Sequence, residues 1–131
     1  MNSSDIAAIE ESLEVKLPES YRSLMCGPDS PRLSDAGLFD EFALIVERTK
    51  EQRQGYGGAP GWPDHLVYVG DQEDACPYAL DVQTGLIVQT DHGNLSEEPL
   101  AHYASIHELA AELLAAEPES VRTAWWKFWK K

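Results

Sequence analysis

A leucine–proline pair at positions 17 and 18 divides the start of this chain into two short helical segments. Upstream of the pair, Ile6, Ile9 and Leu13 recur at the spacing of one helical face. Proline disfavours helical backbone in the residue before it, but it fits the first turn of a new helix. The sequence therefore predicts a short amphipathic helix, a break, and a second helix from Pro18 to about Met25.

The middle of the chain has the character of a β-sheet. The run Leu66–Val69 is apolar throughout, as expected of a strand that is covered on both faces. Two further runs, Tyr78–Val82 and Leu86–Thr90, flank a short turn in which Gly85 can adopt a positive φ angle. These runs predict a strand followed by a β-hairpin.

The segments around these strands are less regular. Gly27–Gly37 is rich in proline, glycine, serine and aspartate and is predicted to be a loop, followed by a candidate short strand at Leu38–Phe39. Phe42–Gln54 alternates partly like a strand, but its later charged residues favour a helix. Ser105 and Glu108 have the spacing of a capping box at the start of a further helix. We expect the apolar face of that helix to pack on the sheet; its residues are Ile106, Leu109, Leu113 and Leu114.

Together these segments predict an α+β fold, with a mostly antiparallel central sheet flanked by an N-terminal helix pair and C-terminal helices. At 131 residues the chain is long enough for one domain with its own core. We place that domain at residues 1–118, and an aromatic and basic helix packed on it at residues 119–131. No apolar run approaches the roughly 18–20 residues that a membrane span requires.

The cysteines and the N-terminus both favour a reducing cytoplasm. Cys26 and Cys76 are far apart and form no CxxC motif, so two reduced thiols are expected, with a disulfide between them as the open alternative. Asp5 and Glu10 stand where a secretory signal would carry positive charge and an apolar run. We therefore expect a cytoplasmic protein.

The charge of the chain is strongly negative and unevenly distributed. The net charge is −13, and no lysine or arginine occurs between Arg53 and Arg122. Binding to phosphate groups depends on lysine and arginine, so we expect neither a nucleic-acid nor a membrane partner. Such a surface attracts a basic protein and accelerates the encounter with it. Solubility in an acidic proteome explains the negative sign as well, but accounts less readily for so long a gap.

No motif in the sequence indicates an enzyme or a metal site. The acidic turn that begins at Asp71 lacks the glycine and the glutamate that an EF-hand loop requires at its sixth and twelfth positions. The four histidines have no zinc-binding spacing, and neither a nucleophile elbow nor a phosphate-binding loop is present. A cysteine–histidine pair assembled by the fold stays an open alternative. We expect no catalytic residue, no metal and no cofactor.

The order of these motifs resembles that of the SUKH superfamily, the Smi/Knr-type domain. The resemblance rests on the initial helix pair and on four later segments: Leu66–Asp71, Tyr78–Asp81, Leu86–Val88 followed by Asp91 and His92, and Tyr103–Ile106. It covers roughly residues 5–116. The chain departs from the family pattern at Gln72–Pro77, where a more glycine-rich segment is usual.

The resemblance implies a protein-binding function. SUKH members are similar to immunity proteins of bacterial polymorphic-toxin and contact-dependent systems, and other members act as regulatory interaction domains in eukaryotes. We therefore predict a non-enzymatic immunity protein, a monomer or weak homodimer, that covers the active site of a cognate toxin such as a basic nuclease. The alternative is a regulatory or adaptor module unrelated to toxins, and an enzyme ranks third.

We predict that acidic residues on the turns and strand ends of the sheet form the partner-binding face, with two aromatic residues as anchors. The acidic residues are Asp71, Glu73, Asp74, Asp81 and Asp91, and the anchors are Trp62 and Tyr78. The reason is that the gap in positive charge coincides with the predicted β region, and aromatic side chains dominate many protein interfaces.

The C-terminal segment carries an aromatic stripe at helical spacing, which contains Val121, Ala124, Trp125, Phe128 and Trp129. We expect this stripe to pack on the domain itself. The open alternatives are a partner or dimer interface and, ranked last, adsorption to a membrane surface.

Deleting residues 119–131 should lower the melting temperature, because each large side chain that loses its burial forfeits about 1.5–3 kcal/mol. Differential scanning calorimetry measures the change. Trp126 lies off the stripe, so its fluorescence should be the most readily quenched of the C-terminal tryptophans. An unchanged melting temperature together with lost dimerisation or partner capture would instead identify the segment as an interface.

Overall fold

The structure is a computed structural model, and it describes residues 1–55, 60–72 and 75–116. The predicted α+β class is confirmed. Within these ranges the helices are α1 (Ser3–Leu13), α2 (Glu19–Met25), α3 (Ser30–Ala36), α4 (Phe42–Gln54) and α5 (Ile106–Ala115). The strands are β1 (Leu66–Gln72), β2 (Cys76–Asp81), β3 (Ile87–Gln89) and β4 (Ala101–Tyr103). They follow one another across the sheet in chain order, and every pairing is antiparallel.

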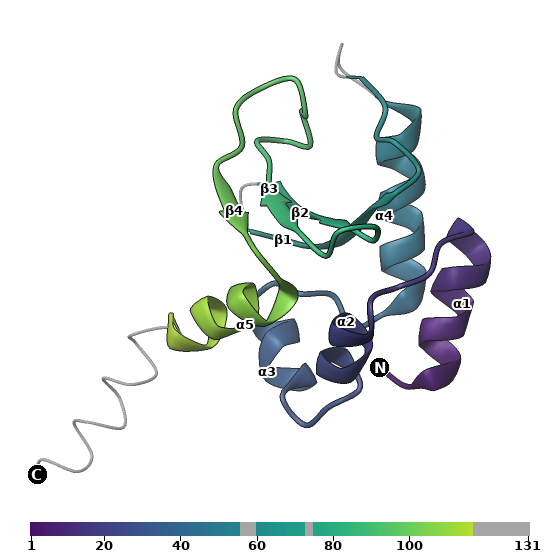
Figure 1. Cartoon of the computed structure of the whole chain (residues 1–131), viewed down its shortest axis with the longest axis vertical. Coiled ribbons are helices and arrows are strands. Elements are labelled where there is room, and N and C mark those ends of the chain that lie inside the picture. Colours follow the sequence, from purple (N-terminus) through teal and green to yellow (C-terminus); the bar gives the residue numbers. More distant parts are fainter. Residues whose placement is uncertain (56–59, 73–74, 117–131) are drawn as a thin grey trace, which may run out of the picture.

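Figure 1 shows two groups of helices around the sheet. In the first group, α4 contacts both α1 and β1, so α1 is the outer helix. In the second, α2, α3 and α5 gather at one end of the sheet. The sheet is therefore supported from two directions by helices.

The predicted helix pair at the start of the chain is confirmed. α1 begins with a capping box, in which the Asn2 side chain accepts the Asp5 amide and the Asp5 carboxylate accepts the Asn2 amide, both at 3.0 Å. α2 follows directly after the proline. Glu10 of α1 stabilises the break between the helices, because its carboxylate accepts the Leu17 amide at 2.8 Å.

The prediction of a loop over Gly27–Gly37 is wrong, because residues 30–36 form α3. Pro31 stands in the first turn, where its missing N–H is not needed, and Gly37 caps the end with a φ angle of 122°. The Leu33 side chain is fully buried and anchors the helix in the core. The prolines and glycines that suggested a loop therefore mark the ends of a short helix.

The helix predicted at Phe42–Gln54 is confirmed with the same bounds. Ile45, Thr49 and Gln52 are buried at helical spacing, which excludes the alternative strand. The Thr49 hydroxyl accepts the backbone amide of Tyr68 in β1 at 2.9 Å. This buried hydrogen bond joins α4 to the sheet.

The predicted strand and hairpin are also confirmed. β1 extends beyond the predicted end at Val69 to Gln72, and its first five residues are buried. Gly85 stands in the turn between β2 and β3 with a φ angle of 81°. β3 is shorter than expected, since only residues 87–89 pair with the neighbouring strands.

Two apolar clusters lie on the two faces of the sheet. The larger contains Val67 and Val69 of β1 and side chains from every helix of the described chain. The smaller contains Trp62, Tyr68 and Ala79. Because side chains alternate along a strand, β1 contributes to both clusters and forms the layer between them.

α5 begins where it was predicted, but it packs differently. The Ser105 hydroxyl accepts the Glu108 amide at 3.2 Å, as in a capping box. The Glu108 carboxylate, however, accepts the amide of Ala104 at 2.8 Å, one residue before the expected position. The apolar face lies mainly against α2 and α3, with a smaller contact to β4, so the prediction that it packs on the sheet is corrected to a mainly helix–helix interface.

Some predictions fall on residues that the structure does not describe. They include the helix at residues 119–131 and the domain boundary at residue 118. Cys26 and Cys76 are described, and they are not bonded to each other. In the described ranges, no helix is long and apolar enough to cross a membrane.

Two glycines allow the segment between α3 and α4 to cross the end of β1. Leu38 forms an isolated antiparallel bridge with Gly70. The short strand predicted at Leu38–Phe39 therefore consists of this single bridge. The Phe39 amide donates to the Val69 carbonyl at 2.9 Å. A Cβ atom on Gly70 would lie 2.2 Å from the carbonyl oxygen of Gly37, so any side chain there would separate the two segments.

The substitution Gly70→Ala should lower the free energy of unfolding by about 3 kcal/mol, because the added methyl group must displace backbone. Urea denaturation measures the loss. The matched control is Gly85→Ala, where no atom lies within 4 Å of the added Cβ and only the φ angle of 81° is unfavourable. That change should cost about 1–2 kcal/mol. Equal losses in the two variants would contradict the importance of the crossing.

Candidate functional site

A groove of about 420 Å³ lies where the end of α3 meets the end of β1. Its lining residues are Ser34, Asp35, Ala36, Gly37, Phe39, Asp71 and Gln72, and we call it the acidic groove. Among the described residues, the lining holds two carboxylates and no lysine or arginine. Asp71 belongs to the predicted binding face, whereas the other lining residues were not predicted.

The glycine crossing creates the acidic groove. The Asp71 amide donates to the Gly37 carbonyl at 3.0 Å, so the two walls are joined through their backbones. A Cβ atom on Gly37 would lie 2.7 Å from the Asp71 carbonyl oxygen. The groove therefore depends on the absence of side chains at the crossing, and this brings Asp35 and Asp71 to the same cavity although they are far apart in sequence.

The Asp71 carboxylate is held in place by a stack of aromatic rings. The Tyr68 hydroxyl donates to Asp71 Oδ2 at 2.7 Å. The Tyr68 ring stacks on Phe39 and on Trp62, with centroid distances of 5.7 Å in both pairs. The Trp62 indole N–H in turn donates to the Gly93 carbonyl at 2.8 Å. This arrangement fixes the Tyr68 hydroxyl and, through it, the orientation of the carboxylate.

Trp62 and Tyr78, the two predicted aromatic anchors, are buried, with exposed fractions of 3% and 2%. Neither ring can contact a partner in this conformation, so the direct-contact role is corrected. Trp62 instead supports the Tyr68 ring. The Tyr78 hydroxyl accepts the Gln72 side-chain N–H at 2.6 Å, and burial raises the pKa of Tyr78 above its ordinary value. The two rings belong to different apolar clusters, Tyr78 to the larger and Trp62 to the smaller, and neither lines the acidic groove.

The remaining predicted acids do not form one cluster. Asp71 pairs with Pro77, but Asp81 pairs with Leu66, so the two carboxylates lie at opposite ends of the β1–β2 pair. Asp81 accepts the backbone amides of the following turn at 2.8 and 3.3 Å. Asp91 follows β3 at the end of the sheet that carries Asp71. Glu73 and Asp74 lie outside the described residues.

The balance of charge differs between the two parts of the molecule. In the helical part, which comprises residues 1–55 with α1 to α4, three arginines pair with acids three residues away. They are Arg22 with Glu19 at 2.5 Å, Arg32 with Asp29 at 3.8 Å, and Arg48 with Glu51 at 3.2 Å. In the sheet part, which comprises residues 60–72 and 75–103, the ion pairs seen among described residues involve histidine: His65 lies 3.9 Å from Asp81, and His92 lies 2.6 Å from Asp91. The acids near the sheet are therefore not neutralised by lysine or arginine of their own segment.

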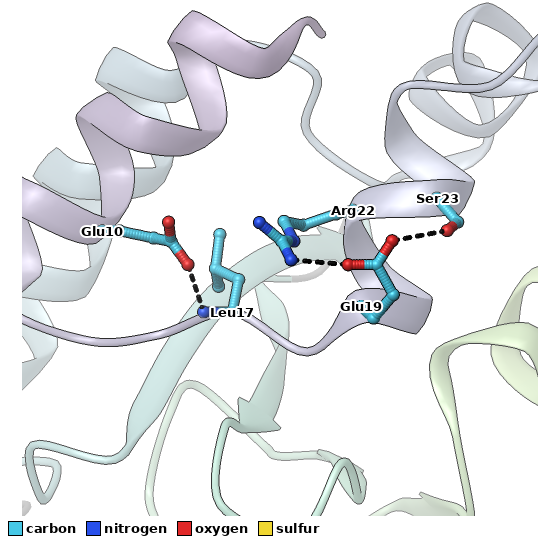
Figure 2. Close-up of polar contacts among 5 residues, drawn as sticks. All are labelled: Glu10, Leu17, Glu19, Arg22 and Ser23. Atoms are coloured by element: carbon cyan, nitrogen blue, oxygen red, sulfur yellow. Dashed lines mark hydrogen bonds and ion pairs between the residues drawn. The ribbon is translucent and has the colours of Figure 1, made fainter.

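A second groove, of about 390 Å³, lies between α1 and α2. Figure 2 shows polar contacts of its walls: Glu10 reaches the backbone at Leu17, and Glu19 lies between Arg22 and Ser23. Glu10 thus joins α1 to the break before α2, and Glu19 and Arg22 pair with each other within α2, so these charged groups already have partners in the protein. The acidic groove is the stronger candidate for a binding site.

The sequence contained one indication of the groove residues that were not predicted. The candidate strand at Leu38–Phe39 follows a glycine, and it precedes two further acids, Asp40 and Glu41. This segment could have been placed beside β1, but its partner residue was not evident from the sequence. Within residues 1–55, 60–72 and 75–116, no group of three His, Cys, Asp or Glu side chains is arranged to hold a metal ion.

Comparison with known families agrees with the fold and the motifs. Residues 1–103 match the SMI1 / KNR4 family (SUKH-1), which includes immunity proteins of polymorphic toxin systems and is generally non-catalytic. No curated protein matches the sequence significantly. The family match begins at the helix pair and continues through β4, so it includes every residue that lines the acidic groove. The chain therefore belongs to the SMI1/KNR4 (SUKH-1) family.

Proposed function

We propose that this protein is an immunity protein that binds a basic toxin domain and blocks its active site. The observation that carries the proposal is the separation of charge within the molecule. No lysine or arginine occurs in residues 54–121. In the helical part, by contrast, three arginines form ion pairs with acids. The negative charge that remains for a partner is therefore concentrated in residues 54–121, the stretch that contains the sheet and α5.

Such a distribution affects association more than it affects folding. Uncompensated carboxylates produce a negative potential that draws a positively charged protein toward one side of the molecule. The same field repels nucleic acids, which are the substrates of many toxins. A carboxylate-rich surface can thus occupy a groove built for phosphate groups, and a nuclease domain fits this description.

Family membership supports this proposal without deciding it. The SMI1/KNR4 family includes immunity proteins, but one fold can serve several functions. The charge separation supplies the independent argument from the site. It favours a basic partner, because the acidic groove offers two carboxylates and, among its described lining residues, no lysine or arginine.

The direct test is co-expression of this protein with a toxin domain encoded by a neighbouring gene. Cells that express the toxin domain alone should die, and cells that also express this protein should survive. The proposal would be overturned if both cultures died equally and this protein formed no stable complex with the toxin domain. Capture of a non-toxic partner would favour the regulatory or adaptor module instead.

The association rate with that toxin domain should depend steeply on salt. Raising ionic strength from about 20 mM to about 150 mM shortens the Debye length to about 8 Å, so association should slow at least about tenfold while dissociation changes by less than about threefold. Stopped-flow fluorescence or surface plasmon resonance measures both rates.

Neutralising three acids at the end of β1 tests which side is used. The variant Asp71→Asn, Glu73→Gln, Asp74→Asn should associate at least about tenfold more slowly than the natural protein. The matched control removes the same total charge from three exposed acids elsewhere. Its substitutions are Glu11→Gln in α1, Glu14→Gln at the C-cap of α1 and Glu47→Gln in α4. If the control slows association as much as the first variant, the end of β1 is not the binding side.

A further inference from the structure

We propose that the acidic groove receives an arginine side chain of the basic partner, with Asp35 and Asp71 binding the guanidinium and Phe39 lying beside its plane. This inference rests on the proposed function and assigns a specific subsite to it. It is argued from four features of the groove: its unsatisfied acceptors, its aromatic wall, its rigidity and its size.

The groove presents hydrogen-bond acceptors to which no group of the described residues donates. Among the described residues, the Asp35 carboxylate has no hydrogen-bond or ion-pair partner. Asp71 accepts one hydrogen bond, from Tyr68 through Oδ2, which leaves Oδ1 available. Gln72 donates its side-chain N–H to Tyr78, so its carbonyl oxygen is also an available acceptor. A guanidinium group carries five N–H donors and no acceptor, which complements this set.

The aromatic wall distinguishes guanidinium from ammonium. Phe39 lines the groove and is half-buried, and its ring is nearly parallel to Tyr68, with an interplanar angle of 8°. A planar guanidinium can stack on such a ring while its edge binds carboxylates, whereas the compact, strongly hydrated ammonium of lysine cannot do both equally well. The groove should therefore prefer arginine to lysine.

The receiving carboxylate is already oriented before a partner arrives. Tyr68 is confined between Phe39 and Trp62, so its hydroxyl holds Asp71 at 2.7 Å without help from a ligand. Groups that are fixed in advance lose little conformational entropy on binding. Tyr68 is thus a positioning residue, and it need not touch the arginine itself.

The size and charge of the groove exclude other occupants. Its volume of about 420 Å³ is near the lower end of ligand-sized cavities, which suits one inserted side chain. Its two carboxylates repel an anion such as phosphate. For a metal ion, no suitable group of three ligands occurs in the described chain. The groove between α1 and α2 has its own arginine, so it does not offer the same environment.

The test is an NMR titration of the full chain with N-acetyl-arginine-N-methylamide, and separately with the lysine counterpart. The arginine probe should shift the backbone amides of Gly37, Asp71 and Gln72 in a saturable manner. The lysine probe should bind at least about threefold more weakly, because it lacks the planar fork and the stacking surface.

Matched variants separate the groove from the general acidity of the protein. Asp35→Asn with Asp71→Asn should weaken arginine binding about tenfold or more, since it removes two charge-assisted interactions. The control is Glu97→Gln with Glu98→Gln, which removes the same charge at two exposed residues outside the groove and should leave binding within about twofold. Tyr68→Phe keeps the stacked ring and should weaken binding less than the double substitution does.

Three results would overturn this inference: shifts spread over the acidic surface without saturation, equal binding of the two probes, or equal losses in the groove and control variants. Their meaning is separate from that of the proposed function. Salt-dependent toxin capture without arginine binding would leave the immunity role intact and remove only this subsite. Specific arginine binding in a protein that fails to protect cells would retain the subsite and reject the toxin as its partner.

Discussion

The close approach of Gly37 to Gly70 is the constraint on which the rest of the site depends. At this crossing a hydrogen-bonded backbone segment lies against the end of β1, and a Cβ atom on Gly70 would come within 2.2 Å of a carbonyl oxygen. The crossing sets the position of Phe39, which completes the aromatic stack, and it joins the end of α3 to Asp71. One steric requirement therefore positions both the buried support and the exposed carboxylates.

The two parts of the protein treat charge in opposite ways. The helical part carries arginines beside acids, and exposed pairs of this kind add little stability but leave little net field. The sheet part has no lysine or arginine of its own, so its field extends outward and weakens only over the Debye length. In the proposed function, long-range attraction depends on the whole sheet part, and local recognition depends on the geometry of a single groove.

Local sequence signals predicted the elements well, because each has a short-range physical cause. Proline defined the start of α2, Gly85 defined the hairpin, and apolar continuity defined β1. α3 was missed because its prolines and glycine were taken as loop residues, although they fit the two ends of a helix. Charge distribution pointed to Asp71, but the acidic groove could not be predicted, because Asp35 joins it through a long-range crossing that leaves no periodic pattern in the sequence.

The aromatic residues show why a residue type alone does not assign a role. Trp62 and Tyr78 were predicted to contact a partner because aromatic residues are common at interfaces. In the fold they are almost completely buried: Trp62 stacks on Tyr68, and the Tyr78 hydroxyl accepts a hydrogen bond from Gln72, which lines the groove. An exposed aspartate on a mobile turn would lose freedom when it binds, whereas Asp71 is held by Tyr68 beforehand. Burial of Trp62 therefore acts on the candidate site indirectly, since its stack with Tyr68 confines the hydroxyl that orients the Asp71 carboxylate.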